Sequence, residues 1–372
     1  MPYVLRNLPA PVYGTKLTLA LCENKLKEHR LTGSVPLNVV EPGDAVTAGV
    51  FKVEFIHVNH SIPGACALAI HTPVGVIVHT GDFKIDFTPQ DGAPLNFGRF
   101  AELGNQGVLA LLADSTNVER PGYTISEKKV AETFNSLFAK ANGRVIIAMF
   151  ASNVSRIQSV VDSSVRYGRR VCLVGRSMVN VAKVAIQLGY LNIPEGKLIS
   201  ADDLDRYPDD EITVVTTGSQ GEPMSGLSRM AFAEHRKLEI RESDMVIISA
   251  TPIPGNEKSV SRVINQLFRI GANVIYESLA EVHASGHARQ EELKLMHTLV
   301  RPKFFIPVHG EYRHLHHHAT LARNLGMPYD NVLIPEIGDV IELDANGLDV
   351  TGVVPNGSVL IDGLGIGDVG AV

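Results

Sequence analysis

The run Val76-Ile77-Val78-His79-Thr80-Gly81-Asp82-Phe83-Lys84 decides the interpretation of this chain. Residues 76–78 form an apolar pattern typical of a buried strand, and Gly81 lets the backbone turn sharply after it. Asp82 then projects from a strand end, where its carboxylate could bridge two cations. The alternative for Asp82 is a turn residue that caps backbone amides, because aspartate is a common turn former.

Two histidines occupy the same kind of position. His60, within Asn59-His60-Ser61-Ile62-Pro63, follows the apolar run 53–58. His309, within Val308-His309-Gly310-Glu311, follows the run 304–308. Each histidine alone could be a hydrogen-bonded residue at a strand edge. Three ligand-type side chains at three strand ends together predict half of a two-metal hydrolase site.

Composition limits the class of protein. The chain has 372 residues, 45% hydrophobic and 20% charged, which is enough for a sizeable core and two domains. Its longest apolar stretches are far shorter than the roughly 20 residues of a membrane-spanning helix, and the N-terminus lacks a signal-peptide pattern. Three scattered cysteines without C-x-x-C spacing indicate a reducing compartment. We therefore expect a cytoplasmic protein that does not bind a membrane.

Apolar runs of strand length alternate with helical patterns, as in an α/β protein. Strands are predicted at 145–150 and 171–174 and a helix at 178–188, which together indicate βαβ units and a parallel sheet. The run Thr124-Ile125-Ser126-Glu127 resembles a capping box that opens another helix. Residues 67–72 and 74–80 are predicted to form an antiparallel hairpin. The middle of the chain therefore looks inserted into an outer, layered domain.

A polyanion would need local binding sites, because the formal net charge is -6. Four segments of the middle region run from a strand into small or polar residues, where exposed amides attract anions. Arg156 and Arg176 lie beside these turns, and each could bind a phosphate through two hydrogen bonds. The alternative for each arginine is helix capping or a salt bridge. The candidate phosphate contacts of this region are Ser152, Asn153, Arg156, Arg176, Ser177, Ser219 and Gln220.

The order of these motifs resembles bacterial ribonuclease J, a β-CASP nuclease family of the metallo-β-lactamase superfamily. The resemblance implies that His60, Asp82 and His309 bind two divalent metal ions, with zinc preferred and manganese or magnesium as alternatives. Asp114, in Ala113-Asp114-Ser115-Thr116-Asn117, matches the first β-CASP motif. His287, in Ala284-Ser285-Gly286-His287-Ala288, matches the second. By resemblance, the catalytic residues are Asp82, Asp114 and His287, while Ser285, Gly286 and His287 contact substrate phosphate.

The resemblance also implies a fold. We expect a metallo-β-lactamase αββα sandwich with an inserted β-CASP α/β domain. The predicted limits are 1–128 and 285–362 for the two parts of the sandwich, 129–284 for the insertion, and 363–372 for a glycine-rich linker. No H-x-H-x-D-H run occurs in the sequence, and Gly64 stands where the family has aspartate. We therefore expect an incomplete metal site and a chain truncated at both ends relative to the family.

The histidines at 314, 316, 317 and 318 invite a second metal interpretation. His314 and His318 are four residues apart and would share a helix face. No aspartate lies between these histidines, and the segment runs from His309 into a predicted surface helix. A solvated histidine-rich face is therefore the preferred interpretation.

The expected function is metal-dependent hydrolysis of RNA, as 5′ to 3′ exonuclease and endonuclease in mRNA decay and rRNA maturation. The resemblance implies single-stranded RNA with 5′-monophosphorylated ends as substrate, and a homodimer or homotetramer for the intact protein. One alternative is a catalytically inactive RNA-binding or assembly module. A small-molecule hydrolase of the same superfamily is the third possibility, although Asp114 and His287 match motifs that accompany nucleic-acid substrates.

Overall fold

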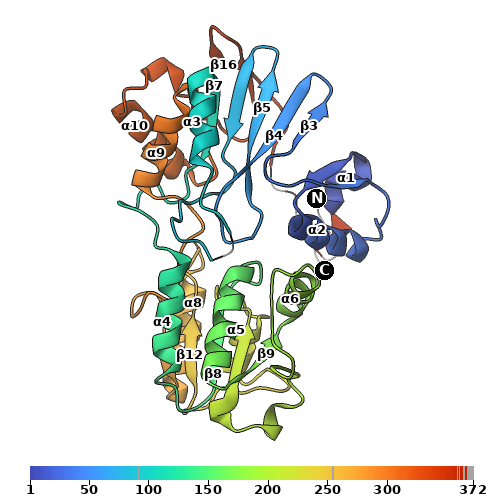
Figure 1. The fold of residues 1–372 in the computed structure, drawn as a ribbon, viewed down its shortest axis with the longest axis vertical. Coiled ribbons are helices and arrows are strands. Elements are labelled where there is room, and N and C mark those ends of the chain that lie inside the picture. The colour runs from blue at the N-terminus through green and yellow to red at the C-terminus, as the bar shows by residue number, and fades with distance from the viewer. Residues whose placement is uncertain (91, 254, 358, 360, 363–364, 367–372) are drawn as a thin grey trace.

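Two six-stranded sheets organise the chain, one in each lobe of the molecule (Figure 1). The computed structural model describes residues 1–90, 92–253, 255–357, 359, 361–362 and 365–366. Strands of the first sheet come from both ends of the sequence, and those of the second sheet from the middle. The α/β class predicted from the sequence is confirmed.

The first sheet has the order β14-β7-β6-β5-β4-β3. Strands β3 to β6 are antiparallel neighbours, whereas β6, β7 and β14 are parallel. The hairpin predicted around Pro73 is confirmed, since Ile70 pairs with Ile77. The strands are β3 (Ala45–Ala48), β4 (Phe51–His57), β5 (Cys66–Thr72), β6 (Gly75–His79), β7 (Val108–Asp114) and β14 (Pro302–Val308).

Helices cover one face of this sheet, and a small β-ribbon covers the other. The helices α3 (Phe97–Gln106), α9 (Gln290–Val300) and α10 (Tyr312–Asn324) supply apolar residues such as Phe100, Met296 and Ala319 to one core. On the opposite face, β15 (Asp339–Leu343) and β16 (Leu348–Val353) pack Leu348 against Leu109 and Phe304. Helices α3 and α9 approach so closely that a Cβ on Gly104 would lie 2.0 Å from the Leu299 carbonyl oxygen.

The second sheet is entirely parallel, with the order β10-β9-β11-β8-β12-β13. The strands and helix predicted at 145–150, 171–174 and 178–188 correspond to β8, β9 and α6. The strands are β8 (Val145–Ala148), β9 (Arg170–Val174), β10 (Leu198–Ile199), β11 (Ile212–Thr216), β12 (Met245–Ile248) and β13 (Asn273–Ile275).

Helices lie on both faces of the second sheet, as expected for a parallel sheet. Val130, Ile157 and Met178 bring α4 (Glu127–Phe138), α5 (Val154–Arg166) and α6 (Arg176–Gln187) into one core. Leu227 and Leu267 bring α7 (Gly226–Ala231) and α8 (Glu257–Ile270) into the core on the other face. Burial on both faces explains why strands such as β8 and β12 consist only of apolar residues.

The N-terminal segment forms a small unit of its own beside both lobes (Figure 1). It comprises α1 (Pro2–Asn7), β1 (Val12–Gly14), α2 (Lys16–Glu28) and β2 (Leu37–Val39), with β1 and β2 parallel. Leu17 of α2 joins the core of the second lobe. Short elements complete the chain: η1 (Leu204–Arg206), η2 (Asp209–Glu211), η3 (Tyr329–Asn331), β17 (Ile361–Asp362) and β18 (Gly365–Ile366).

Two sequence predictions about the layout of the chain stay untested. The domain limits stay predictions, and the glycine-rich linker at 363–372 lies, apart from β18, outside the described residues. Within the described parts of the chain, no helix combines the length and apolar character needed to span a bilayer.

The predicted capping box before α4 is wrong. The N-cap is Ser126, whose hydroxyl oxygen accepts from the Lys128 amide at 3.1 Å. Thr124 instead donates its hydroxyl to Glu292 at 2.7 Å, and Glu127 binds Arg156 rather than its own helix terminus. Tertiary hydrogen bonds from two buried partners therefore displaced the local capping pattern.

Glu292 lies in the first turn of α9 with 0% exposure, and it connects three segments of the first lobe. Its carboxylate accepts from the Ile85 amide at 2.7 Å and from the Thr124 amide at 2.7 Å. It also accepts from the Thr124 hydroxyl at 2.7 Å and from the Arg289 amide at 2.8 Å. These bonds satisfy donors that would otherwise be buried without partners.

We expect Glu292→Gln to lower the free energy of unfolding by about 2 kcal/mol, because the new amide N–H₂ would face donors where an acceptor is needed. Urea-induced equilibrium unfolding measures the change. The matched control is Glu291→Gln, which alters a half-exposed neighbour paired with Lys294 and should stay within about 0.5 kcal/mol of wild type. Equal losses in both variants would contradict this role for Glu292.

Candidate active site

Five side chains predicted as metal ligands or catalytic residues meet near the carboxyl ends of strands of the first sheet. Asp82 follows β6, Asp114 ends β7 and His309 follows β14. Ligand-type atoms of Asp82, Asp114, His287 and His309 all lie within 4.8 Å of one another. His60, from the loop after β4, places its Nε2 3.9 Å from Asp82 Oδ2. The structure therefore brings together every residue of the predicted metal and catalytic set.

Asp114 is the most buried member of this cluster, with 2% exposure. Its carboxylate accepts from His287 Nδ1 at 2.7 Å, from His309 Nδ1 at 3.2 Å and from the Thr116 hydroxyl at 2.7 Å. Burial alone would raise the pKa of Asp114, but the hydrogen bonds from the two histidines and Thr116 outweigh it and hold that pKa well below its usual range. Asp114 is therefore a fixed anion that orients two imidazoles.

His309 adopts a left-handed backbone conformation with φ of 57°, which is unusual for a residue other than glycine. Its carbonyl oxygen accepts from the Ser115 amide at 3.2 Å, so the turn is held from the β7 side. The hydrogen bond to Asp114 raises the pKa of His309 despite the opposing effect of burial. Such backbone strain is often found where a side chain must be aimed at a functional site.

His60 is fixed by the segment that carries His287. His60 Nδ1 lies 2.9 Å from the Gly286 carbonyl oxygen, which can only accept, so Nδ1 carries the proton and Nε2 keeps its lone pair. Gly286 permits this approach because a Cβ there would lie 2.5 Å from His60 Nδ1. Burial is the main cause that lowers the pKa of His60, which keeps the ring neutral as a metal ligand requires.

This arrangement fits a divalent metal ion. A carbonyl bonded to the second ring nitrogen is the usual support of a metal-binding histidine. Asp82 is half-exposed, at 44% of its side chain, and its Oδ2 lies 3.9 Å from His60 Nε2. Its Oδ1 lies 3.5 Å from Nδ1 of His309, which donates to Asp114, so Nε2 is the nitrogen of that ring left for a metal. Imidazole nitrogens and carboxylate oxygens are ligands that zinc accepts. The chemistry of the donor set therefore suits zinc.

Two further histidines lie beneath the site rather than on the surface. His318 Nδ1 lies 2.9 Å from the Ser115 hydroxyl, and His318 Nε2 lies 3.2 Å from His297 Nε2. The predicted solvated face is therefore wrong for His314 and His318, which are buried on the core side of α10. His314 Nδ1 accepts from the Glu311 amide at 3.0 Å, so its Nε2 is protonated and offers no lone pair to a metal.

Several predicted phosphate contacts are buried instead. The expectation that Arg156 binds substrate phosphate is corrected, because its guanidinium is 1% exposed and is bonded inside the protein. Asn153 caps α5 by accepting from the Arg156 amide, and Gln220 bonds the Thr251 carbonyl. Ser219 is likewise buried. By contrast, Ser152 before α5 and Arg176 and Ser177 at the start of α6 are exposed, and the Ser285 hydroxyl accepts from Asn117 at 2.8 Å.

Sequence reasoning missed the residues that hold the site in place. Thr116 contacts both Asp114 and His309, at 2.7 Å and 2.8 Å. Asn117 donates to the Ser285 hydroxyl at 2.8 Å and to the His287 carbonyl at 3.0 Å. Both residues lie in the motif that identified Asp114, so the sequence did contain a signal that they belong to the site. Asn59 likewise precedes His60 in the motif that identified it, and its side-chain oxygen accepts from the amides of Leu95 and Asp86.

Two family models match parts of the chain. One, described as "Ribonuclease J, beta-CASP domain", covers residues 142–267. The other, described as "Zn-dependent metallo-hydrolase RNA specificity domain", covers residues 272–335. The first range contains the second sheet apart from β13, and the second range carries His287 and His309. These matches agree with the expected metallo-β-lactamase fold and its β-CASP insertion, which are thereby confirmed.

Curated relatives match nearly the whole chain. Ribonuclease J of Thermus thermophilus is 44% identical over 99% of this chain and 65% of its own length. Ribonuclease J of Helicobacter pylori is 45% identical over 97% of this chain and 52% of its own length. Ribonuclease J2 of Bacillus subtilis is 44% identical over 100% of this chain and 66% of its own length. The chain thus spans between about half and about two thirds of the length of these relatives.

One solved structure shares the fold at lower identity. It is the crystal structure of a protein of unknown function from Enterococcus faecalis V583, with a TM-score of 0.60 and 18% identity. The match covers 88% of this chain and 74% of the other. At this identity the likeness concerns the fold alone.

The buried histidine pair makes stability depend on pH. Burial lowers the pKa of His297 to about 4. Because an unfolded histidine binds its proton near pH 6.5, the unfolded state binds more protons between pH ~6.5 and ~4. The stabilisation from neutral His297 is therefore present above pH ~6.5 and is lost as the pH falls toward ~4.

Between pH ~6.5 and ~4, we expect the free energy of unfolding of His297→Leu to fall by roughly 3 kcal/mol less than that of wild type. The reason is that leucine binds no proton in either the folded or the unfolded state. Urea unfolding at a series of pH values, on protein treated with a chelator, measures the difference from wild type. His316→Gln, which changes an exposed histidine on α10, serves as control and should keep the wild-type slope. A wild-type slope in His297→Leu would refute the assignment.

Proposed function

The chain belongs to the ribonuclease J family, and on that premise we propose that it contains the catalytic centre of a metal-dependent ribonuclease. The observation that carries the proposal is that His60 and His309 each lie within 4 Å of the Asp82 carboxylate, with Nε2 of His60 free for a metal. These residues come from the ends of separate strands, so their meeting is a property of the fold. A site of fixed imidazoles and a half-exposed carboxylate suits hydrolysis rather than structural metal binding.

The protein residues have separate tasks in this proposal. His60, Asp82 and His309 hold two divalent ions, zinc in preference to manganese or magnesium. When bound, these ions would activate water and offset negative charge on the phosphate. Asp114 accepts from Nδ1 of His287 and leaves Nε2 of that ring to face a phosphate oxygen. Since Asp114 stays ionised, His287 is held in one orientation throughout.

The substrate in this proposal is single-stranded RNA with a 5′-monophosphate, cut by 5′ to 3′ exonuclease and endonuclease action. Ser285, Gly286 and His287 contact phosphate at the site, and the exposed residues Ser152, Arg176 and Ser177 contact phosphate farther along the strand. The cellular setting would be the cytoplasm, in mRNA decay and rRNA maturation, as part of a homo-oligomer. The metallo-β-lactamase parts would span 1–128 and 285–362, and the β-CASP insertion 129–284.

A second candidate is RNA binding without turnover. Within the described residues, His60, Asp82 and His309 would have to serve two ions, because Asp114 and His287 bond one another. Catalytic zinc sites generally use three protein ligands for each metal. This small donor set is the observation that favours an RNA-binding module.

The test is hydrolysis of a 5′-monophosphorylated single-stranded RNA by the purified chain with zinc or manganese. We expect turnover that a chelator abolishes and that Asp82→Ala lowers by roughly 100-fold or more, because the shared ligand is lost. The control Asp330→Ala removes an exposed carboxylate on η3 and should cleave like wild type. Retention of RNA on a filter without cleavage, unchanged by chelation, would support the binding module instead.

A further inference from the structure

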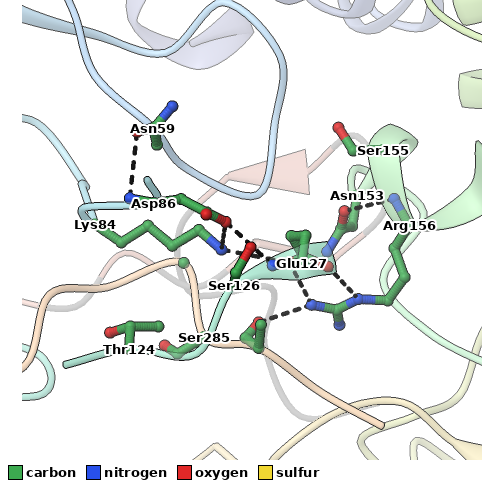
Figure 2. A network of polar contacts seen from close by, with 12 residues as sticks. Asn59, Lys84, Asp86, Thr124, Ser126, Glu127, Asn153, Ser155, Arg156 and Ser285 are labelled. Carbon is green, nitrogen blue, oxygen red and sulfur yellow. Dashed lines mark hydrogen bonds and ion pairs between the residues drawn. The ribbon is translucent and has the colours of Figure 1, made fainter. Parts of the chain in front are cut away.

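Arg156 of α5 is a buried cation, with 1% exposure, at the junction of the two lobes (Figure 2). Its Nε and Nη2 donate to the two carboxylate oxygens of Glu127 at 3.2 Å and 2.6 Å. Nη2 also donates to the Ala284 carbonyl at 2.7 Å. Nη1 donates to His283 Nδ1 at 2.7 Å and to the Ser249 carbonyl at 3.2 Å. The five N–H groups of the guanidinium therefore all have acceptors in fixed directions.

The charges around Arg156 balance. Lys84, two residues after Asp82, is buried and lies 3.5 Å from Asp86 Oδ2 and 3.6 Å from Glu127 Oε1. Two cations thus face two carboxylates, with Glu127 between Lys84 and Arg156 (Figure 2). Burial and the Arg156 cation lower the pKa of His283, so its Nδ1 is a neutral acceptor. A buried charge set of this kind fixes geometry, because losing one member leaves another without a partner.

Arg156 acts on the segment 284–287, which handles phosphate in the proposed function. From one side Arg156 holds the Ala284 carbonyl, and from the other His60 holds the Gly286 carbonyl at 2.9 Å. His287 follows at once and donates to Asp114. A shift of the Ala284 carbonyl would therefore move both the Gly286 carbonyl, which binds His60, and the ring of His287.

We propose that Arg156 is a positioning residue that holds segment 284–287 against His60 and Asp114, and thereby sets the geometry of His287. The expected effect on RNA cleavage rests on the proposed function. The effect on the positions of the two histidine rings does not, because their orientation is observable without substrate.

The test compares Arg156→Lys with Arg144→Lys. Arg144 is also buried and forks onto a carboxylate, Asp244, at 2.8 Å and 2.7 Å, but it precedes β8 and so lies at the opposite end of the same sheet. In both variants lysine keeps the positive charge but cannot make the bidentate contact of the guanidinium with a carboxylate. Two-bond ¹H–¹⁵N spectra of the histidine rings, assigned with His60→Gln and His287→Gln, report tautomer and hydrogen bonding without RNA.

We expect Arg156→Lys to change the His60 and His287 ring signals and to lower kcat on the order of 100-fold with KM nearly unchanged, because a displacement of about 1 Å suffices for such a loss. Arg144→Lys should lower the melting temperature without either effect. Wild-type ring signals in a folded Arg156→Lys variant would overturn the inference. If the wild-type chain does not cleave RNA, the proposed function fails, and the ring signals alone support or overturn the inference.

Should Arg156→Lys fail to fold, Ser249→Ala takes its place. The Ser249 hydroxyl donates to the Val282 carbonyl at 2.6 Å and faces Arg156 Nη1 at 3.4 Å. Its removal loosens the chain two residues before segment 284–287, takes away one acceptor that faces Arg156, and leaves every charge in place. The expected result is the same change in ring signals with a smaller loss of kcat, and unchanged signals would overturn the inference.

Discussion

The carboxylate of Asp114 is the constraint on which the candidate site depends. It is buried at the end of β7 and accepts from His287, His309 and Thr116. A buried carboxylate requires such donors, since an unpaired charge away from water is strongly unfavourable. The need to satisfy this anion therefore draws the loop after β14 and the segment before α9 to the same strand end.

The second constraint is the neutral set of buried charges between the lobes. Lys84 follows β6 of the first sheet, whereas Glu127 opens α4 and Arg156 lies on α5, both beside the second sheet. Buried ion pairs often add little net stability, because desolvation offsets their attraction. Their geometric effect differs, since a guanidinium with five acceptors permits only one arrangement of the groups around it. This junction connects the position of the inserted sheet to the residues of the candidate site.

Sequence reasoning succeeded where a local pattern had one main physical outcome. Strands β8 and β9, helix α6 and the β5–β6 hairpin were predicted because apolar runs and turn residues leave few alternatives. It failed at Glu127, where a capping pattern competed with a distant arginine, and at His318, where a helical position faced the core. The pattern around Arg156 had the same limit, because a turn arginine beside a helix can face solvent or the interior. Local composition does not contain the information that separates these outcomes.

The sequence by itself determined the α/β class, the placement of His60, Asp82 and His309 at strand ends, and the motifs of Asp114 and His287. These follow from short-range rules of strand termination and from motif order. The tertiary structure alone decided that Gly286 supports His60, that His287 and His309 share one carboxylate, and that Arg156 is buried rather than exposed to substrate. Each of these depends on contacts between residues far apart in the chain, because the packing of the two sheets determines which polar groups lose water and must find partners within the protein.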